Sequence, residues 1–513
     1  MNMKRIIVVW SMLLMLAMTL LAGCASSSGS SPDTNAPLSA GNINLIFVVS
    51  PDLDNDPLGD IQPYTANLTS KGLNRSLQMA TFLKQQVLGG NNVTAIYALA
   101  PMTHLQTTNN YPDMTAIGFI QQFALLNQIV TPTSTYTGNS YRLFVQYGDL
   151  VGVVPSGVVE PSPYIPGAQG LAFDDASGNN IALVTRIIEE NQLGFHVFSA
   201  PWKTTSDLLA KINTRYGNLK LPTTYMGSNY VYVISISITP LPSGSASLVT
   251  YNSNLTPPST YPVLPPPLIG SASCGQQGTI SYTLPNEVNG DIVPPNHNTY
   301  QRVYIVRHAD AHPDPESEFE DGNYVGAGQW RALALPNFLP DALKGQRRPT
   351  VVYSIDPAQS FSLSANFSVS YVRPSLTVLP YAIANNLPFY LATSFSIGIN
   401  PTDLDVARKT SNFFFTHPHL DGDGVDLSGQ TILLAWESGH IRPFLNALMA
   451  SYSANPPVLP TAATTELEAG GWPHNDYDTI WTVTLDAQGN LTVDNYLCEG
   501  IDSTSLPATA PQF

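Results

Sequence analysis

An arginine and a histidine, Arg307 and His308, stand side by side directly after a short apolar run. The preceding residues, Val303-Tyr304-Ile305-Val306, suit a strand that is buried on both faces. Ligands of open α/β sheets bind beyond the carboxyl ends of the strands, so the pair stands where a ligand is expected. Arginine offers planar, bidentate donors to a phosphomonoester, and a neutral imidazole can attack phosphorus to form a phosphohistidine. The pair therefore favours phosphoryl chemistry.

This part of the chain resembles the histidine phosphatase superfamily, which includes phosphoglycerate mutases and histidine acid phosphatases. Arg307-His308-Ala309 matches the family's opening motif, and Gly328 begins a segment similar to its Gly-led helix. Arg373 stands four residues before Thr377, which is the spacing of the family's second arginine. The resemblance implies that His308 is the nucleophile and that Arg307 and Arg373 clamp phosphate oxygens. It implies no metal and no cofactor.

The family's second histidine, which follows another buried strand, has no direct match. After Ile432 to Ala435 the chain reads Trp436-Glu437-Ser438-Gly439-His440, with Glu437 or Ser438 at the family's histidine position. Three alternatives stay open. His440 binds phosphate while Glu437 is the general acid; or Glu437 acts without a second histidine, with weak activity; or the pocket only binds a ligand.

The other histidines near this region do not form a recognisable zinc spacing, and we expect His312, His417 and His419 to be loop residues. The acidic stretch from Asp314 to Asp321 is expected to be a solvated loop over the site. Alternatively, it disfavours highly anionic substrates.

The elements that must position these residues occur twice in the chain. A shift of 256 residues gives seven identities in one ungapped register. The pairs are Gly72 with Gly328, Arg75 with Arg331, Leu77 with Leu333, Phe82 with Phe338, Leu83 with Leu339, Tyr97 with Tyr353 and Pro101 with Pro357. The pattern predicts a strand, a helix and a strand in each half: helices at 73–87 and 329–343, and following strands at 94–99 and 350–355.

Strands that alternate with helices predict parallel sheets. We therefore expect an α/β protein with two tandem three-layer αβα domains and mainly parallel sheets. The predicted boundaries are 42–256 for a degenerate first domain, 257–299 for a Pro-rich linker and lead-in, and 300–513 for the second domain.

The first half has lost each chemical position. Val49 and Ser50 stand opposite Arg307 and His308, Ile117 opposite Arg373, and Thr204 near the place of His440. We expect a catalytically silent copy that packs against the second half or contacts a protein partner.

The N-terminus predicts export and a lipid anchor. Lys4 and Arg5 precede an apolar run that ends in Leu-Ala-Gly-Cys at Cys24. This is the pattern of a secretion signal over residues 1–23, and its end resembles a bacterial lipobox in which Cys24 is lipidated. The alternative is an ordinary membrane anchor. Residues 24–41 predict a flexible tether. The expected location is the bacterial cell envelope, and the outer membrane is favoured.

Composition excludes some partners and suggests one crosslink. Loss of Lys4 and Arg5 changes the formal net charge from −16 to −18, and an acidic chain with 21 lysines and arginines is a poor nucleic-acid binder. Cys274 and Cys498 are an even pair in an oxidising compartment, so they are a disulfide candidate. The alternative is two buried thiols.

The leading hypothesis is an envelope phosphatase that hydrolyses small phosphomonoesters through His308. The alternative is a phosphatase-fold lipoprotein that is weak or inactive and serves as a binding or interaction module. A mutase is disfavoured, because nothing in the sequence suggests a site for a phosphorylated cofactor.

Overall fold

The computed structural model describes the chain from residue 35 onward, with gaps. The described residues are 35–55, 59–101, 105–106, 111–127, 143–146, 179–238, 245–273, 278–288, 291–292, 296–311, 322–358, 360–364, 367–392, 404–417, 426–459 and 471–513. Within these ranges no helix combines the length and apolar character needed to cross a bilayer. The sequence features that lie outside them are the signal segment, Cys24, Cys274, His312, the acidic stretch and His419.

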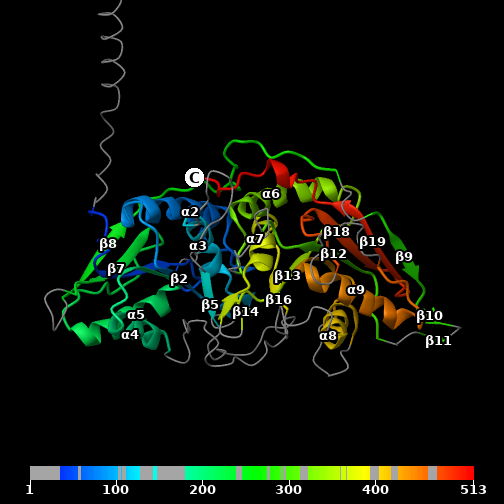
Figure 1. Cartoon of the computed structure of the whole chain (residues 1–513), viewed down its shortest axis with the longest axis horizontal. Helices are drawn as coiled ribbons and strands as arrows, with labels where there is room; N and C mark the ends of the chain where they lie inside the picture. Colours follow the sequence, from blue (N-terminus) through cyan, green and yellow to red (C-terminus); the bar gives the residue numbers. More distant parts are fainter. Residues whose placement is uncertain are drawn as a thin grey trace, which may run out of the picture. The chain divides into compact units, whose positions relative to one another are not determined.

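The first half forms a six-stranded sheet in the order β5-β2-β6-β1-β7-β8 (Figure 1). Its strands are β1 (Ile43–Val49), β2 (Ala95–Leu99), β5 (Leu143–Gln146), β6 (Gly194–Ala200), β7 (Tyr230–Ile236) and β8 (Ala246–Asn252). Every residue of β1 and β6 is buried, and in β1 the apolar run from Leu45 to Val48 predicts this. A short separate pair, β3 (Leu105–Gln106) and β4 (Tyr111–Pro112), follows β2.

The described helices of the first half are α2 (Ser70–Phe82), which continues as the π-helical turn η1 (Leu83–Val87), α3 (Thr115–Leu125), α4 (Asn179–Glu189) and α5 (Trp202–Tyr216). Two of their ends carry recognisable signals. The Thr69 side chain caps α2 by accepting from the Gly72 amide, and Gly217 ends α5 in the left-handed conformation.

The second half forms a seven-stranded sheet in the order β16-β13-β17-β12-β18-β19-β9. Its strands are β9 (Ser281–Leu284), β12 (Gln301–Arg307), β13 (Val351–Ser354), β16 (Phe389–Leu391), β17 (Thr431–Trp436), β18 (Thr479–Leu485) and β19 (Leu491–Cys498). Two further strand pairs lie apart: β10 (Glu287–Val288) with β11 (Asp291–Ile292), and β14 (Ser360–Ser364) with β15 (Phe367–Ser370). The helices are α6 (Gly326–Ala342), α7 (Arg373–Asn385), α8 (Leu404–Phe415), α9 (Ser438–Tyr452) and the 3-10 turn η3 (Ser503–Ser505).

The two sheets pair their strands in the same way. In both, the four strands from one edge to the centre run parallel, and the next two join antiparallel. Val49 pairs with Ala200 as Arg307 pairs with Trp436, and Tyr97 stands in β2 as Tyr353 stands in β13. Most strands of each sheet therefore run in the same direction, and the antiparallel pairs β7–β8 and β18–β19 are joined by short connections that only antiparallel strands allow.

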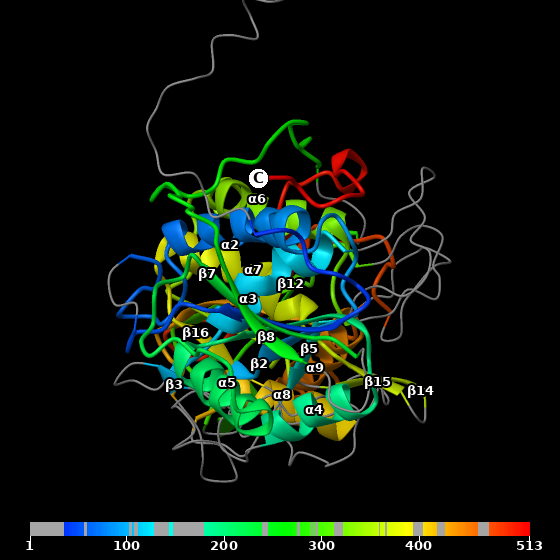
Figure 2. The same ribbon diagram turned by 90° about the vertical axis from the view of Figure 1, so that its left-hand side faces the viewer.

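Helices cover both faces of each sheet. Figures 1 and 2 show α2 and α3 on one face of the first sheet and α4 and α5 on the other. The outer faces pack on separate cores, one with α4 and α5 and one with α8 and α9. The inner faces share one core, which takes residues from α2 and α3 and also from α6 and α7. Residues 36–513 accordingly form a single compact unit.

Two irregular segments fasten the halves together. The Pro-rich segment runs over α2 and α6: the Asn74 side chain donates to the Thr260 carbonyl, and the Tyr261 hydroxyl donates to the Leu333 carbonyl. The C-terminal segment crosses back over α6 toward α2 (Figure 1). Trp330 donates to the Thr509 carbonyl, and Thr81 of α2 donates to that of Phe513.

Three predicted boundaries shift. The end of the predicted tether is packed, because the Leu38 amide donates to the Val87 carbonyl and the Tyr251 hydroxyl donates to that of Ala36. The predicted lead-in 257–299 contains β9, which pairs with β19 of the second sheet. Helix α2 begins at Ser70, three residues before the predicted start.

Candidate active site at the carboxyl ends of β12 and β17

Arg307 and His308 lie at the carboxyl end of the central strand β12. Neighbouring β17 runs parallel to it, and the His308 amide donates to the Trp436 carbonyl at 3.2 Å. Glu437, one residue beyond β17, therefore lies on the strand end next to His308. Arg307 and His308 are each 1% exposed.

The His308 ring is held by its own backbone. Its Nδ1 lies 2.9 Å from the Ala309 carbonyl oxygen. Because a carbonyl only accepts, Nδ1 carries the proton in this contact, and the lone pair of the neutral ring is on Nε2. This is the tautomer that a nucleophilic histidine requires.

Two tyrosines flank His308, and each carries an arginine on its face. The His308 ring centroid lies 6.2 Å from that of Tyr371 and 6.1 Å from that of Tyr477. The Arg373 guanidinium carbon is 4.7 Å from the Tyr371 ring centroid, and that of Arg307 is 4.1 Å from the Tyr477 ring centroid. The structure thus brings the three predicted residues Arg307, His308 and Arg373 together.

Backbone contacts fix both arginines further. Arg307 Nη1 donates to the carbonyls of Pro473 and His474, at 3.1 and 2.7 Å. Arg373 is the first residue of α7, whose N-terminal end favours an anion. The Thr377 hydroxyl accepts from the Ala309 amide and donates to the Arg373 carbonyl, both at 2.7 Å. The predicted Arg-to-Thr spacing therefore ties α7 to the loop after His308.

Glu437 and His440 form a pair. Glu437 caps α9 by accepting from the His440 amide at 3.0 Å, and its carboxylate lies 2.5 Å from His440 Nδ1. The same carboxylate cap explains why the helix begins at Ser438, and it places His440 in the first turn of α9. A carboxylate oxygen accepts from Nδ1–H, so Nε2 is the ring nitrogen that this pair does not use.

A buried ion cluster supports the loop after His308. Arg331 Nε lies 2.6 Å from Asp310 Oδ2, and Arg331 Nη1 lies 2.8 Å from Glu499 Oε2. Asp478 is a third carboxylate at 3.7 Å. Burial, and repulsion by Asp478 and Asp310, raise the pKa of Glu499 to about 8 against the opposing effect of Arg331.

Sequence reasoning missed three residues of this edge. Asp356 follows β13, is 2% exposed, and burial raises its pKa to about 7. Its signal was present, since it lies two residues beyond the buried strand β13 and directly after the predicted strand 350–355. Tyr371 and Tyr477 had no such signal, because their role depends on which arginine stacks on which ring.

The remaining predicted positions have mixed outcomes. His417 lies in a bend after α8. Cys498 ends β19 and is disulfide-bonded, but its pairing with Cys274 stays a prediction because Cys274 is outside the described residues. Within the described part of the chain, no three histidine, cysteine or acidic side chains gather as a metal site.

The equivalent edge of the first half carries other side chains. The Ser50 amide donates to the Ala200 carbonyl at 3.0 Å, as His308 does to that of Trp436. Helix α3 begins at Thr115, so the helix starts align Thr115 rather than Ile117 with Arg373. Neither residue is a cation.

No protein-family model and no curated protein matches this chain. Solved structures match about two fifths of it. The putative phosphohistidine phosphatase SixA from Agrobacterium tumefaciens is 16% identical, with a TM-score of 0.21, over 36% of this chain and 92% of that one. A mycobacterial glucosyl-3-phosphoglycerate phosphatase is 13% identical, with a TM-score of 0.24, over 38% and 97%. A protein described as mycobacterial hydrolase 2 is 12% identical, with a TM-score of 0.22, over 42% and 93%.

Proposed function

We propose that the edge formed by β12 and β17 is a phosphomonoesterase site. The observation that carries the proposal is the group around His308, whose Nδ1–H is bound to a carbonyl while two buried arginines stack on the tyrosines beside it. Arginines buried in a site of low dielectric interact strongly with an anion, and a phosphoryl group supplies one.

The proposed reaction has two steps. His308 Nε2 bonds to phosphorus while the bond from phosphorus to the leaving oxygen breaks, and that oxygen takes a proton from the Glu437–His440 pair. A water molecule then attacks the phosphohistidine and gives a proton to the same pair, which releases inorganic phosphate and restores His308. Arg307 and Arg373 hold the phosphoryl oxygens whose charge changes during transfer.

The first experiment uses the full chain with p-nitrophenyl phosphate at pH 5 to 8. We expect His308→Ala to lower turnover about a thousandfold or more, because the nucleophile is lost. Ser50→Ala, at the equivalent position of the first half, is the matched control and keeps wild-type turnover. Acid-labile phosphate on the wild-type chain, and none on His308→Ala, would identify the intermediate. Wild-type turnover no greater than that of His308→Ala contradicts the enzymatic proposal.

A second candidate function is oxyanion binding without hydrolysis. It is favoured by Glu437, because a carboxylate rather than a second histidine follows β17 at the strand end beside His308. Thermal shift with tungstate separates the two. Stabilisation without turnover supports binding, and the absence of both rejects a phosphate site.

The sequence supports the rest of the proposal. We propose that the two halves arose by tandem duplication. We also propose that export and lipid attachment at Cys24 bring the chain to the outer membrane, and that Cys274 and Cys498 form a disulfide there. The first half, which lacks the chemical residues, is proposed to support the second or to contact a protein partner.

A further inference from the structure

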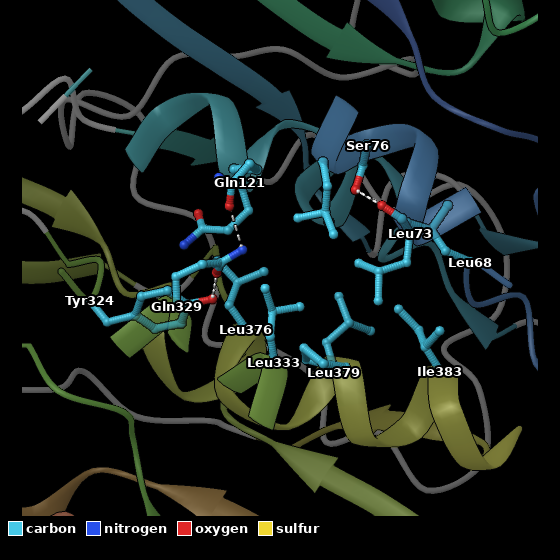
Figure 3. Close-up of a pocket in the computed structure, with 14 residues that line it drawn as sticks. Leu68, Leu73, Ser76, Gln121, Tyr324, Gln329, Leu333, Leu376, Leu379 and Ile383 are labelled. Atoms are coloured by element: carbon cyan, nitrogen blue, oxygen red, sulfur yellow. Dashed lines mark hydrogen bonds between the residues drawn. The ribbon is translucent and has the colours of Figure 1, made fainter. Parts of the chain in front are cut away.

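The seam between the two halves contains a buried polar network at one end of an apolar crevice of about 20 Å³. Figure 3 shows leucines of both halves facing one another across the crevice, with Gln121 and Gln329 at its polar end. Gln121 Nε2 donates to Asn323 Oδ1 at 2.8 Å, and Asn323 Nδ2 donates back to Gln121 Oε1 at 3.0 Å. Both side chains are 3% exposed.

The neighbouring glutamine extends this network. Gln122 Oε1 accepts from Gln329 Nε2 at 2.9 Å, and Gln122 Nε2 donates to the Pro511 carbonyl at 2.6 Å. Gln329 accepts in turn from the Tyr324 hydroxyl at 2.6 Å. A buried network with its amide groups bonded in this way fixes one geometry, because a displaced partner leaves a desolvated polar group.

Asn323 belongs to the loop that holds the candidate phosphate clamp. The carbonyl of Gly322 accepts from the amides of Val372 and Arg373, at 2.9 and 3.1 Å. On its other side, the amide of Val325 donates to the Asp310 carbonyl at 3.0 Å. Residues 322–325 therefore connect the start of α7 with the loop that follows His308.

We propose that Gln121 of the first half is a positioning residue, which holds Arg373 in place through Asn323 and the Gly322 carbonyl. The inference rests on the proposed function for its catalytic meaning. It gives the first half a role in the site of the second: helix α3 supplies the fixed partner against which the 322–325 loop is set. The paired amides have no net charge, so this effect does not depend on pH.

The test compares Gln121→Leu with Asn127→Leu in the full chain. Asn127 is a matched control because it is also a buried amide of the first half, and its contacts reach the Phe123 carbonyl and the Val93 amide within that half. Both variants lose buried hydrogen bonds, but only Gln121→Leu loses the contact with Asn323. The double variant Gln121→Asn with Asn323→Gln exchanges the longer and the shorter side chain, so the two amides can pair again. It should therefore rescue the contact.

The first measurement is amide hydrogen exchange at Val372 and Arg373, which does not depend on activity. We expect Gln121→Leu to raise exchange there about tenfold or more, Asn127→Leu to leave it unchanged, and the double variant to restore protection. Equal exchange in both single variants overturns the inference even if the chain is an active phosphatase.

The second measurement concerns the site itself. We expect Gln121→Leu to raise the KM for p-nitrophenyl phosphate and the Kd for tungstate by a factor on the order of ten, with a smaller change in kcat, because Arg373 contacts the phosphoryl group in the bound state. Unchanged constants also contradict the inference. If the wild-type chain neither turns over nor binds tungstate, the proposed function fails, while hydrogen exchange still decides whether Gln121 positions the loop.

Discussion

The two sheet edges have the same backbone and different chemistry. β1 pairs with β6 in the register in which β12 pairs with β17, and the amide that follows each central strand donates to its neighbour. On this common frame the second half presents Arg307 and His308, whereas the first presents Val49 and Ser50. The comparison shows that the backbone frame forms without Arg307 and His308, so the fold alone does not require them.

The identities that both halves share have a structural reason. Arg75 Nε lies 2.5 Å from Asp60 Oδ2, as Arg331 Nε lies 2.6 Å from Asp310 Oδ2. The glycines at the equivalent position of α2 and α6 are also explained by the same contact. A Cβ on Gly72 would meet the Asp60 carbonyl oxygen at 2.1 Å, and one on Gly328 would meet that of Asp310 at 2.6 Å. These identities preserve a loop-to-helix contact.

The two arginines differ in how many acidic side chains they contact. Arg331 faces Asp310, Glu499 and Asp478, whereas Arg75 has Asp60 as its one ion-pair partner among the described residues and otherwise binds the neutral Asn229 and Leu255. Asp60 also has Lys71 at 3.8 Å.

The largest expected effect is therefore on Arg331→Met. Removal of the cation deprives three acidic side chains of their shared partner, and we expect the free energy of unfolding to fall by about 3–5 kcal/mol. Arg75→Met should cost clearly less, because Lys71 still faces Asp60. Urea denaturation at pH 7 measures both. Equal losses of unfolding free energy in the two variants would show that Glu499 and Asp478 add nothing to the stabilisation by Arg331.

A second contrast is Asp356, whose counterpart in the 256-residue register is Ala100. The pKa of Asp356 is raised to about 7 by burial, so the folded state binds its proton more tightly than the unfolded chain does. Its contribution to stability is therefore fully present below about pH 4 and is lost as the pH rises to about 7.

Asp356→Ala tests this directly. Between pH 4 and pH 7 the wild-type chain should lose on the order of 2–4 kcal/mol that the variant does not lose. Asp54→Ala, which removes an exposed carboxylate of the first half, is the control and should keep the wild-type slope. If the free energy of unfolding of wild type and of Asp356→Ala depends on pH in the same way, the raised pKa of Asp356 is contradicted. The readout is urea denaturation at several pH values.

Much of the fold and of the site could be predicted from the sequence. The apolar runs located β1, β12 and β17, because strands buried on both faces leave an uninterrupted signal. The strand-end rule located Arg307 and His308. The predicted strand at 350–355 is observed as Val351–Ser354, and the helix at 329–343 as Gly326–Ala342.

The features that were missed depend on tertiary contacts. Packing of the first half on the second was one of the two expectations, but an apolar helix face predicts burial without naming its partner, so the sequence did not indicate that α2, α3, α6 and α7 share one core. Gln121 and Asn323 are 202 positions apart, and nothing local marks either as one of a pair. Asp356 lies where the strand-end rule applies, but a lone carboxylate at a strand end does not by itself indicate phosphate binding.

The smallest expected effect concerns Thr377, which accepts from the Ala309 amide. Aligned by β1 and β12, the residue of the first half opposite Ala309 is Pro51, which has no amide proton and needs no acceptor. Thr377→Val keeps the shape but leaves the Ala309 amide desolvated and without its acceptor, so we expect the free energy of unfolding to fall by about 1–3 kcal/mol. Thr377→Ser retains the hydroxyl and should recover most of this loss in urea denaturation. If Thr377→Ser is as unstable as Thr377→Val, the methyl group rather than the hydrogen bond stabilises this contact, and the contrast between Ala309 and Pro51 has no energetic meaning.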